Sequence, residues 1–262
     1  MVDYISLSVN ENKDYYDMLP TVAYAYRKFF PECKLILSIL TCVPGVIVKN
    51  MRDYVDDIFI YNTVKGIPTC NLAKMARQYM AANLPIGRTC MVNDIDTIVL
   101  QRKFFEDRWN KRPKGSMLAI GRELYKDKKD AGKFPISYMA AESEVFRTLF
   151  TCSGMTWNNF ISFMLRVRNV TGKEDISKPF KVFSDESYIK AVSGTLQGKI
   201  FHQPRIFVPA VDSIARRTKF LDINKLVKSG YFEAHHLLPI NENRSKMEAI
   251  CKFLGTELRT IS

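Results

Sequence analysis

The sequence feature that most constrains the fold is the alternation of strand-like and helix-like segments in the first third of the chain. Residues 4–9 alternate in polarity with a period of two, and residues 35–40 form the apolar run of a strand buried on both faces. Between them, apolar side chains recur at helical spacing over residues 18–30. A strand over 57–61 and a helix over 71–83 continue the pattern. This order predicts an α/β fold, with a Rossmann-type, mostly parallel central sheet flanked by helices.

The remaining two thirds follow a less regular pattern. Asp17 is expected to cap the first helix, with Pro20 in its first turn. Helical spacing predicts helices over residues 98–109, 143–150, 157–167, 186–193 and 241–254. Apolar runs predict strands over residues 90–92, 116–120, 136–140, 199–202 and 205–208. Since no repeat, low-complexity tract or linker interrupts the chain, we expect one domain over residues 1–262.

The chain is strongly basic, with a formal net charge of +12. Clusters of Lys and Arg lie at residues 111–114, 126–129 and 216–219. A charge of this sign favours polyanionic partners, which include nucleic acid, an anionic surface and phosphorylated substrates. The alternative is that these basic loops are only solvated surface.

Several features predict a cytoplasmic protein. The longest uncharged run, residues 35–48, contains Pro44 and Gly45 and falls short of the about 20 apolar residues that a membrane span needs. The first residues lack the basic and apolar regions of a signal peptide. The six cysteines include no Cys-x-x-Cys pair, which indicates neither a zinc site nor a disulfide framework. We therefore expect no transmembrane segment and a reducing compartment.

Two carboxylates follow one predicted strand at a spacing suited to a metal. Asp94 and Asp96 come directly after the apolar run 90–92, and in an extended segment both would point the same way while Ile95 points into the core. Such a pair suits a hard cation, Mn²⁺ or Mg²⁺, and leaves room in its coordination sphere for phosphate oxygens. The alternative is a pair of solvated turn residues.

Four further segments, taken in order, give the chain a family resemblance. They are a helix with basic Arg77 before the carboxylate pair, the segment 134–142 after it, a late Asp185-Glu186 pair, and His235-His236 followed by Leu-Leu-Pro. In this order and spacing, over roughly residues 4–240, the chain resembles nucleotide-sugar-dependent glycosyltransferases of the GT-A fold. The resemblance implies a nucleotide-sugar-binding half over about residues 1–110 and a less regular acceptor-binding half over about 111–262.

The resemblance also implies a metal centre. Asp96 would bind the metal directly, and Asp94 would contact it through water or hydrogen-bond the ribose. One of the two adjacent histidines would add a ligand or a phosphate contact, with His235 favoured over His236. The implied cofactor is Mn²⁺ or Mg²⁺.

Roles for the substrate contacts follow from the same resemblance. Ser8, Val9 and Asn10 would hold the base and ribose, since they end the first predicted strand. Arg77 would pair with the diphosphate, and Asn93 with Asp94 would complete the nucleotide-sugar site. Trp157 with Asn158 would line the acceptor site. For Arg77 the alternative is a solvated helix arginine, and for Trp157 it is a core tryptophan.

The implied reaction moves a sugar from a nucleotide diphosphate sugar, with UDP favoured, to a hydroxyl acceptor on a glycan or glycoprotein, with nucleic acid as a further acceptor class. Asp185 is the candidate general base, and Glu186 accompanies it in the catalytic pair. A base opposite the leaving group would make the reaction inverting. The alternative is that Asp185 caps a helix and Glu186 is an ordinary first-turn carboxylate.

Three other functions compete with this interpretation. A metal-dependent nucleic-acid-processing enzyme would suit the positive charge, but it needs more converging carboxylates than one pair. A nucleotidyltransferase would carry glycines after the first strand, where residues 8–12 have none. A non-catalytic nucleic-acid-binding protein would have no need of the carboxylates and histidines.

Overall fold

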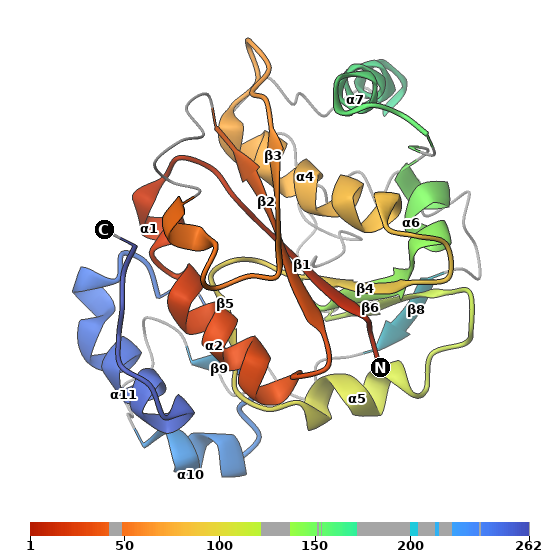
Figure 1. The fold of residues 1–262 in the computed structure, drawn as a ribbon. Coiled ribbons are helices and arrows are strands. Elements are labelled where there is room, and N and C mark those ends of the chain that lie inside the picture. The colour runs from red at the N-terminus through yellow and green to blue at the C-terminus, as the bar shows by residue number, and fades with distance from the viewer. Residues whose placement is uncertain are drawn as a thin grey trace.

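A seven-stranded mixed sheet forms the centre of the molecule (Figure 1). The computed structural model describes residues 1–41, 49–121, 137–150, 152, 154–171, 200–203, 213–214, 222–235 and 237–261. Within them the strands run in the order β3-β2-β1-β4-β7-β6-β8. The first four are parallel, while β7 runs antiparallel to β4 and β6. The predicted mostly parallel α/β sheet is confirmed.

The strands agree closely with the apolar runs of the sequence. Those of the large sheet are β1 (Tyr4–Val9), β2 (Lys34–Leu40), β3 (Asp57–Tyr61), β4 (Thr89–Val92), β6 (Met117–Ile120), β7 (Met139–Glu142) and β8 (Ile200–Gln203). β7 begins three residues later than predicted. The predicted strand over 205–208 and the predicted helix over 186–193 lie outside the described residues.

Helices cover both faces of the sheet (Figure 1). They are α1 (Lys13–Tyr16), α2 (Leu19–Phe29), α4 (Thr69–Asn83), α5 (Lys103–Trp109), α6 (Ser143–Phe150), α7 (Trp157–Thr171), α10 (Ile223–Lys228), η3 (Asn241–Asn243) and α11 (Arg244–Leu254). One apolar core gathers α2, α5, α10 and α11 around Ile5 and Leu7 of β1. A second core gathers α4, α6 and α7 around Ile36 and Leu40 of β2. The side chains of β2 therefore face apolar layers on both sides, as its continuous apolar run predicted.

A second sheet of three short strands corrects one predicted helix. Residues 98–109 were expected to be helical throughout, but β5 (Thr97–Val99) is a strand and α5 begins only at Lys103. β5 pairs antiparallel with β10 (Glu233–His235), which pairs in turn with β9 (Ser213–Ile214). The β-branched residues of β5 favour this pairing, so tertiary contact overrides the local helical spacing.

Asp17 does not cap the first long helix. Its carboxylate instead accepts a hydrogen bond from the backbone N–H of Ile261 (3.0 Å) and one from Lys13 Nζ (3.1 Å). The N-cap of α2 is Met18, which makes no side-chain capping bond, and Pro20 lies in the first turn as predicted. The segment after α11 is thus joined to α1 by a contact that spans almost the whole chain.

No helix among the described residues is both long and apolar enough to cross a bilayer.

One of the three basic clusters contains a partly buried ion pair rather than a free basic loop. Arg112 donates two hydrogen bonds to the carboxylate of Glu142, at 2.7 and 2.8 Å, and its guanidinium lies 4.1 Å from the ring centroid of Trp109. Burial opposes the charge of Glu142, but the hydrogen bonds and charge of Arg112 outweigh it and lower the pKa of this carboxyl group. The other two clusters lie outside the described residues.

We expect Glu142→Gln to lower the free energy of unfolding by about 1 kcal/mol near pH 7, because it leaves the guanidinium of a partly buried pair without its counter-charge. A carboxyl group with a lowered pKa stabilises the fold above its ordinary value of 4.5, and this stabilisation is lost as the pH falls through the lowered value. Urea titrations near neutral pH and in acid measure the difference between variant and wild type. A difference that stays constant into acid would contradict the account, and Glu248→Gln, in an exposed pair with Arg244, serves as control.

Candidate metal centre

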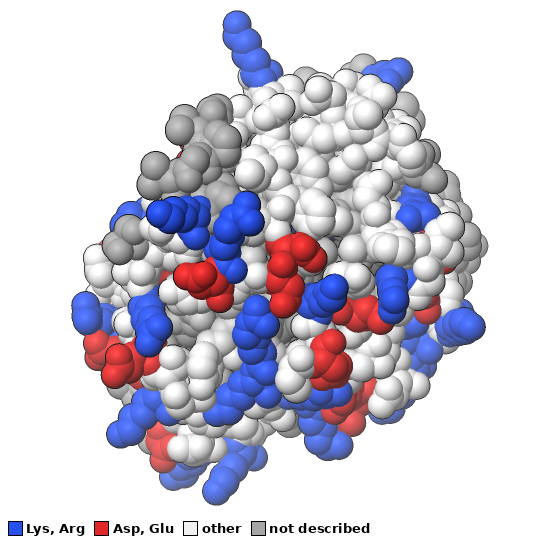
Figure 2. Space-filling view, viewed as in Figure 1, with Lys and Arg blue, Asp and Glu red and all other residues white. Residues whose placement is uncertain are grey.

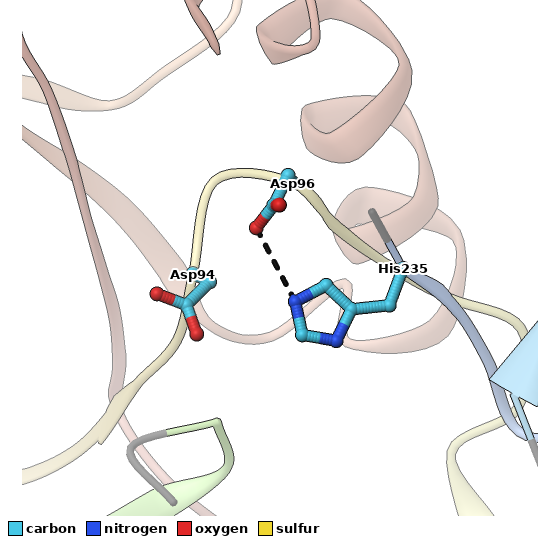
Figure 3. Close-up of side chains that lie close together, drawn as sticks. All are labelled: Asp94, Asp96 and His235. Carbon is cyan, nitrogen blue, oxygen red and sulfur yellow. Dashed lines mark ion pairs between the residues drawn. The ribbon is translucent and has the colours of Figure 1, made fainter. Parts of the chain in front are cut away.

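Three side chains with metal-ligating atoms converge beside the carboxyl end of β4 (Figure 3). One ligand atom each from Asp94, Asp96 and His235 lies within 4.8 Å of the others. The two aspartates flank the turn between β4 and β5, and His235 ends β10. Residues about 140 positions apart thus form one cluster, and the structure brings together the three residues expected to bind the metal.

The aspartates converge through a turn rather than through an extended strand. β4 ends at Val92, and the backbone N–H of Thr97 donates to the carbonyl of Asp94 at 3.1 Å. Ile95, which separates the two aspartates in the sequence, is buried in the apolar core, as expected. The expectation that residues 94–96 are extended was therefore wrong, but the expectation that Ile95 points into the core is confirmed.

Arg77 of α4 holds the turn in place. Its side chain is 4% exposed, and Nη1 donates to the carbonyl of Asn93 at 3.1 Å and pairs with Oδ1 of Asp94. The hydroxyl of Ser137 donates to the other carboxylate oxygen of Asp94 at 2.9 Å. Burial opposes ionisation of Asp94, but the charge of Arg77 prevails and lowers the pKa of this carboxyl group. Arg77 is thus a buried anchor in this structure, not a solvated helix residue.

Asn93 lies buried beneath the turn. Its amide donates to the hydroxyl of Tyr26, and its side-chain oxygen accepts from the backbone N–H of Asp94 at 2.9 Å. Its own backbone N–H donates to the carbonyl of Ser6 on β1 (3.2 Å). Asn93 therefore links the turn to β1 and α2.

His235 lies between two carboxylates. Nε2 is 3.4 Å from Oδ1 of Asp96, the contact drawn in Figure 3, and Nδ1 is 3.7 Å from Oε1 of Glu233. Burial opposes a charged imidazole, but Asp96 first, and Glu233 and Asp94 after it, raise the pKa of His235 to about 9. The acidic groups around the imidazole therefore favour a positive charge at this position.

The donor set fits a divalent cation. Two carboxylates and an imidazole suit Mn²⁺, and the carboxylates alone suit Mg²⁺. Thr97, directly opposite His235 in the ladder, carries a hydroxyl that is buried with no hydrogen-bond partner in the described part of the chain. A buried hydroxyl of this kind costs free energy unless it is satisfied, and a water bound to a cation here would satisfy it.

The nucleotide-binding residues expected at the end of the first strand lie at the carboxyl edge of the sheet. Ser8 and Val9 are buried at the end of β1, in register with Ser38 and Ile39. Asn10 follows, half-buried, and its amide donates to the hydroxyl of Thr69 at the start of α4 (3.1 Å).

The two residues expected to line the acceptor site are the first residues of α7. Trp157 is buried in an aromatic cluster with Tyr61 and Tyr79, at centroid distances of 4.7 and 5.4 Å, and its indole N–H donates to the carbonyl of Asn62. This is the environment of a core tryptophan. Asn158 is exposed at the start of α7.

Asp185, Glu186 and His236 lie outside the described residues.

Two residues that support the cluster were not singled out from the sequence. Glu233 lies two positions before His235 on the same strand, so the period of two already placed both side chains on one face. Ser137 lies in the segment before β7, and only the fold brings it to Asp94.

We expect Arg77→Met to loosen the turn at residues 93–97, because it removes the charge that balances Asp94. The free energy of unfolding should fall by about 3 kcal/mol, and amide hydrogen exchange at the turn should accelerate. Arg244→Met makes the same chemical change at an exposed ion pair on α11 and serves as control. Unchanged exchange at the turn in Arg77→Met would contradict this role.

We expect the imidazole of His235 to titrate near pH 9 and its pKa to fall in Asp96→Asn, which removes the largest attractive charge. Since the pKa is raised above the ordinary value of 6.5, the charged ring stabilises the fold below that value, and this contribution is lost as the pH rises through about 9. Nitrogen-resolved NMR of the histidines, with His235→Gln for assignment, measures the pKa. A wild-type value at or below 6.5 would contradict the geometry.

The comparisons with known proteins concern the fold. No protein-family model and no curated protein sequence matches the chain. Among solved structures, galactosyltransferase LgtC in complex with donor and acceptor sugar analogues superimposes with a TM-score of 0.54 at 11% identity, over 96% of this chain and 95% of LgtC. An active-site mutant of LgtC gives a TM-score of 0.52 at 12% identity over the same shares. The chain has the GT-A glycosyltransferase fold that the resemblance implied.

Proposed function

We propose that this protein is a metal-dependent glycosyltransferase that moves a sugar from a nucleoside diphosphate sugar, with UDP favoured, to a hydroxyl of a glycan or glycoprotein. One observation carries the proposal: Asp94, Asp96 and His235 converge at the carboxyl edge of parallel strands, in a chain with the GT-A fold. Ligands of open α/β sheets bind outside this edge. The similarity to an LgtC structure that holds donor and acceptor sugar analogues supports a sugar substrate.

In this proposal Asp96 and His235 ligate Mn²⁺ or Mg²⁺, and Asp94 contacts the ion through water or the donor ribose. The ion supplies Lewis-acid stabilisation of the diphosphate leaving group. Arg77 fixes Asp94 in its place beside the other two ligands. Thr97 offers its buried hydroxyl to a bound water.

The donor and acceptor would occupy different halves of one domain. Residues 1–110 contribute β1 to β4 and the metal-binding turn, and the end of β1 at residues 8–10 offers a site for the base and ribose. Residues 111–262 would hold the acceptor, with exposed Asn158 as one contact. The general base remains assigned to Asp185, with Glu186 beside it, from the sequence resemblance alone.

Two observations bear on the wider setting. The described cysteines are all free thiols, which supports a reducing compartment such as the cytoplasm. On the face shown in Figure 2, Lys and Arg are interspersed with Asp and Glu, and this mixture favours a glycan acceptor over nucleic acid.

Calorimetry with UDP-, GDP- and dTDP-sugars, with and without Mn²⁺, tests the proposal. We expect one nucleotide to bind only in the presence of the ion, and Asp96→Asn to weaken that binding at least about tenfold, because it removes a charged ligand. Asp107→Asn makes the same chemical change at an exposed ion pair on α5 and should bind as the wild type does. If no nucleotide sugar binds, or if Asp96→Asn binds equally well, the proposal is wrong.

A further inference from the structure

A buried carboxylate lies behind the histidine of the candidate metal centre. The side chain of Glu233 is 0% exposed on β10, where it pairs with Val99 of β5. His235 follows two positions later and pairs with Thr97. Side chains two apart on a strand share a face, so Glu233 and His235 point to the same side of the small sheet.

The imidazole of His235 presents a different nitrogen to each carboxylate. Nε2 faces Asp96 at 3.4 Å, and Nδ1 lies 3.7 Å from Oε1 of Glu233. The 3.7 Å separation exceeds a hydrogen bond, but it is short enough for strong electrostatic attraction at a buried site. In Figure 3 one ring nitrogen points at Asp96 and the other points away from both aspartates.

This order of groups matches the way in which proteins orient a ligating histidine. A neutral imidazole carries one N–H, and the nitrogen without it is the one that can bind a cation. A carboxylate beside the other nitrogen fixes the proton there and makes the ring a better ligand.

We propose that Glu233 is a positioning residue that holds the Nδ1 proton of His235, so that Nε2 is presented to a cation shared with Asp94 and Asp96. This inference rests on the proposed function, since it concerns the same metal centre. Glu233 touches neither the metal nor the substrate and acts only through the imidazole.

Mn²⁺ alone is the probe, and its binding is measured by calorimetry and by the imidazole nitrogen coupling in pulsed electron paramagnetic resonance. Glu233→Met keeps the length of the side chain but cannot accept the Nδ1 proton. We expect it to weaken Mn²⁺ binding by about 10- to 100-fold and to diminish the nitrogen coupling. Glu233→Gln keeps an acceptor without the charge and should recover part of both. Glu248→Gln, at an exposed pair on α11, should match the wild type.

Failure of this inference can be told apart from failure of the proposed function. We expect His235→Ala to abolish the nitrogen coupling. The metal centre itself would be overturned if the wild type bound no Mn²⁺, or if His235→Ala left the coupling unchanged. Suppose instead that the wild type binds Mn²⁺ and that His235→Ala loses the coupling. Glu233 then has no positioning role if a folded Glu233 variant binds Mn²⁺ as tightly as the wild type and with the same coupling. Thermal melts confirm folding, and if the Met variant does not fold, the Gln variant alone decides between these outcomes.

Discussion

The ion pair between Arg77 and Asp94 joins the layers on which the candidate site depends. Arg77 projects from the helix that covers one face of the sheet, and Asp94 belongs to the turn that leaves the central strand β4. The same guanidinium holds the carbonyl of Asn93, whose amide reaches Tyr26 of α2 on the opposite face. Because helix, strand and turn share these bonds, the position of Asp96 is set by the packing of both apolar cores.

The balance of charge around the turn explains why this arrangement suits a cation. Among the described residues, the carboxylates of Asp94, Asp96 and Glu233 gather around two basic groups, Arg77 and His235. Arg77 is already committed to Asp94, and His235 carries its proton only because the acids beside it raise its pKa. A divalent ion that displaces this proton would take its place among the carboxylates and draw a diphosphate to the same edge of the sheet.

Local sequence patterns predicted most of the fold, because apolar runs and helical spacing report burial directly. β1, β3 and α6 have the predicted bounds, and the carboxylate pair lies where the central strand ends. The patterns failed where distant pairing decides the structure. The spacing of residues in β5 fits the start of a helix, but β5 pairs with β10 instead. Asp17 fits a helix N-cap, but its carboxylate accepts a hydrogen bond from the backbone N–H of Ile261. These outcomes depend on contacts between segments far apart in the chain.

The site was predictable to the extent that its residue types carry the chemistry. Asp94, Asp96 and His235 were expected to meet, and they do. The buried link of Arg77 to Asp94 depends on which helix packs beside the turn, and no local pattern contains that information. The link of Glu233 to His235 was open to prediction, because residues two apart on a strand share a face.

The most direct test is an anomalous diffraction map from crystals grown with Mn²⁺ and UDP. The account predicts one manganese peak bonded to a carboxylate oxygen of Asp96 and to Nε2 of His235, with the diphosphate completing its coordination sphere. A well-ordered map with no peak at these residues, or with UDP bound elsewhere, would contradict it.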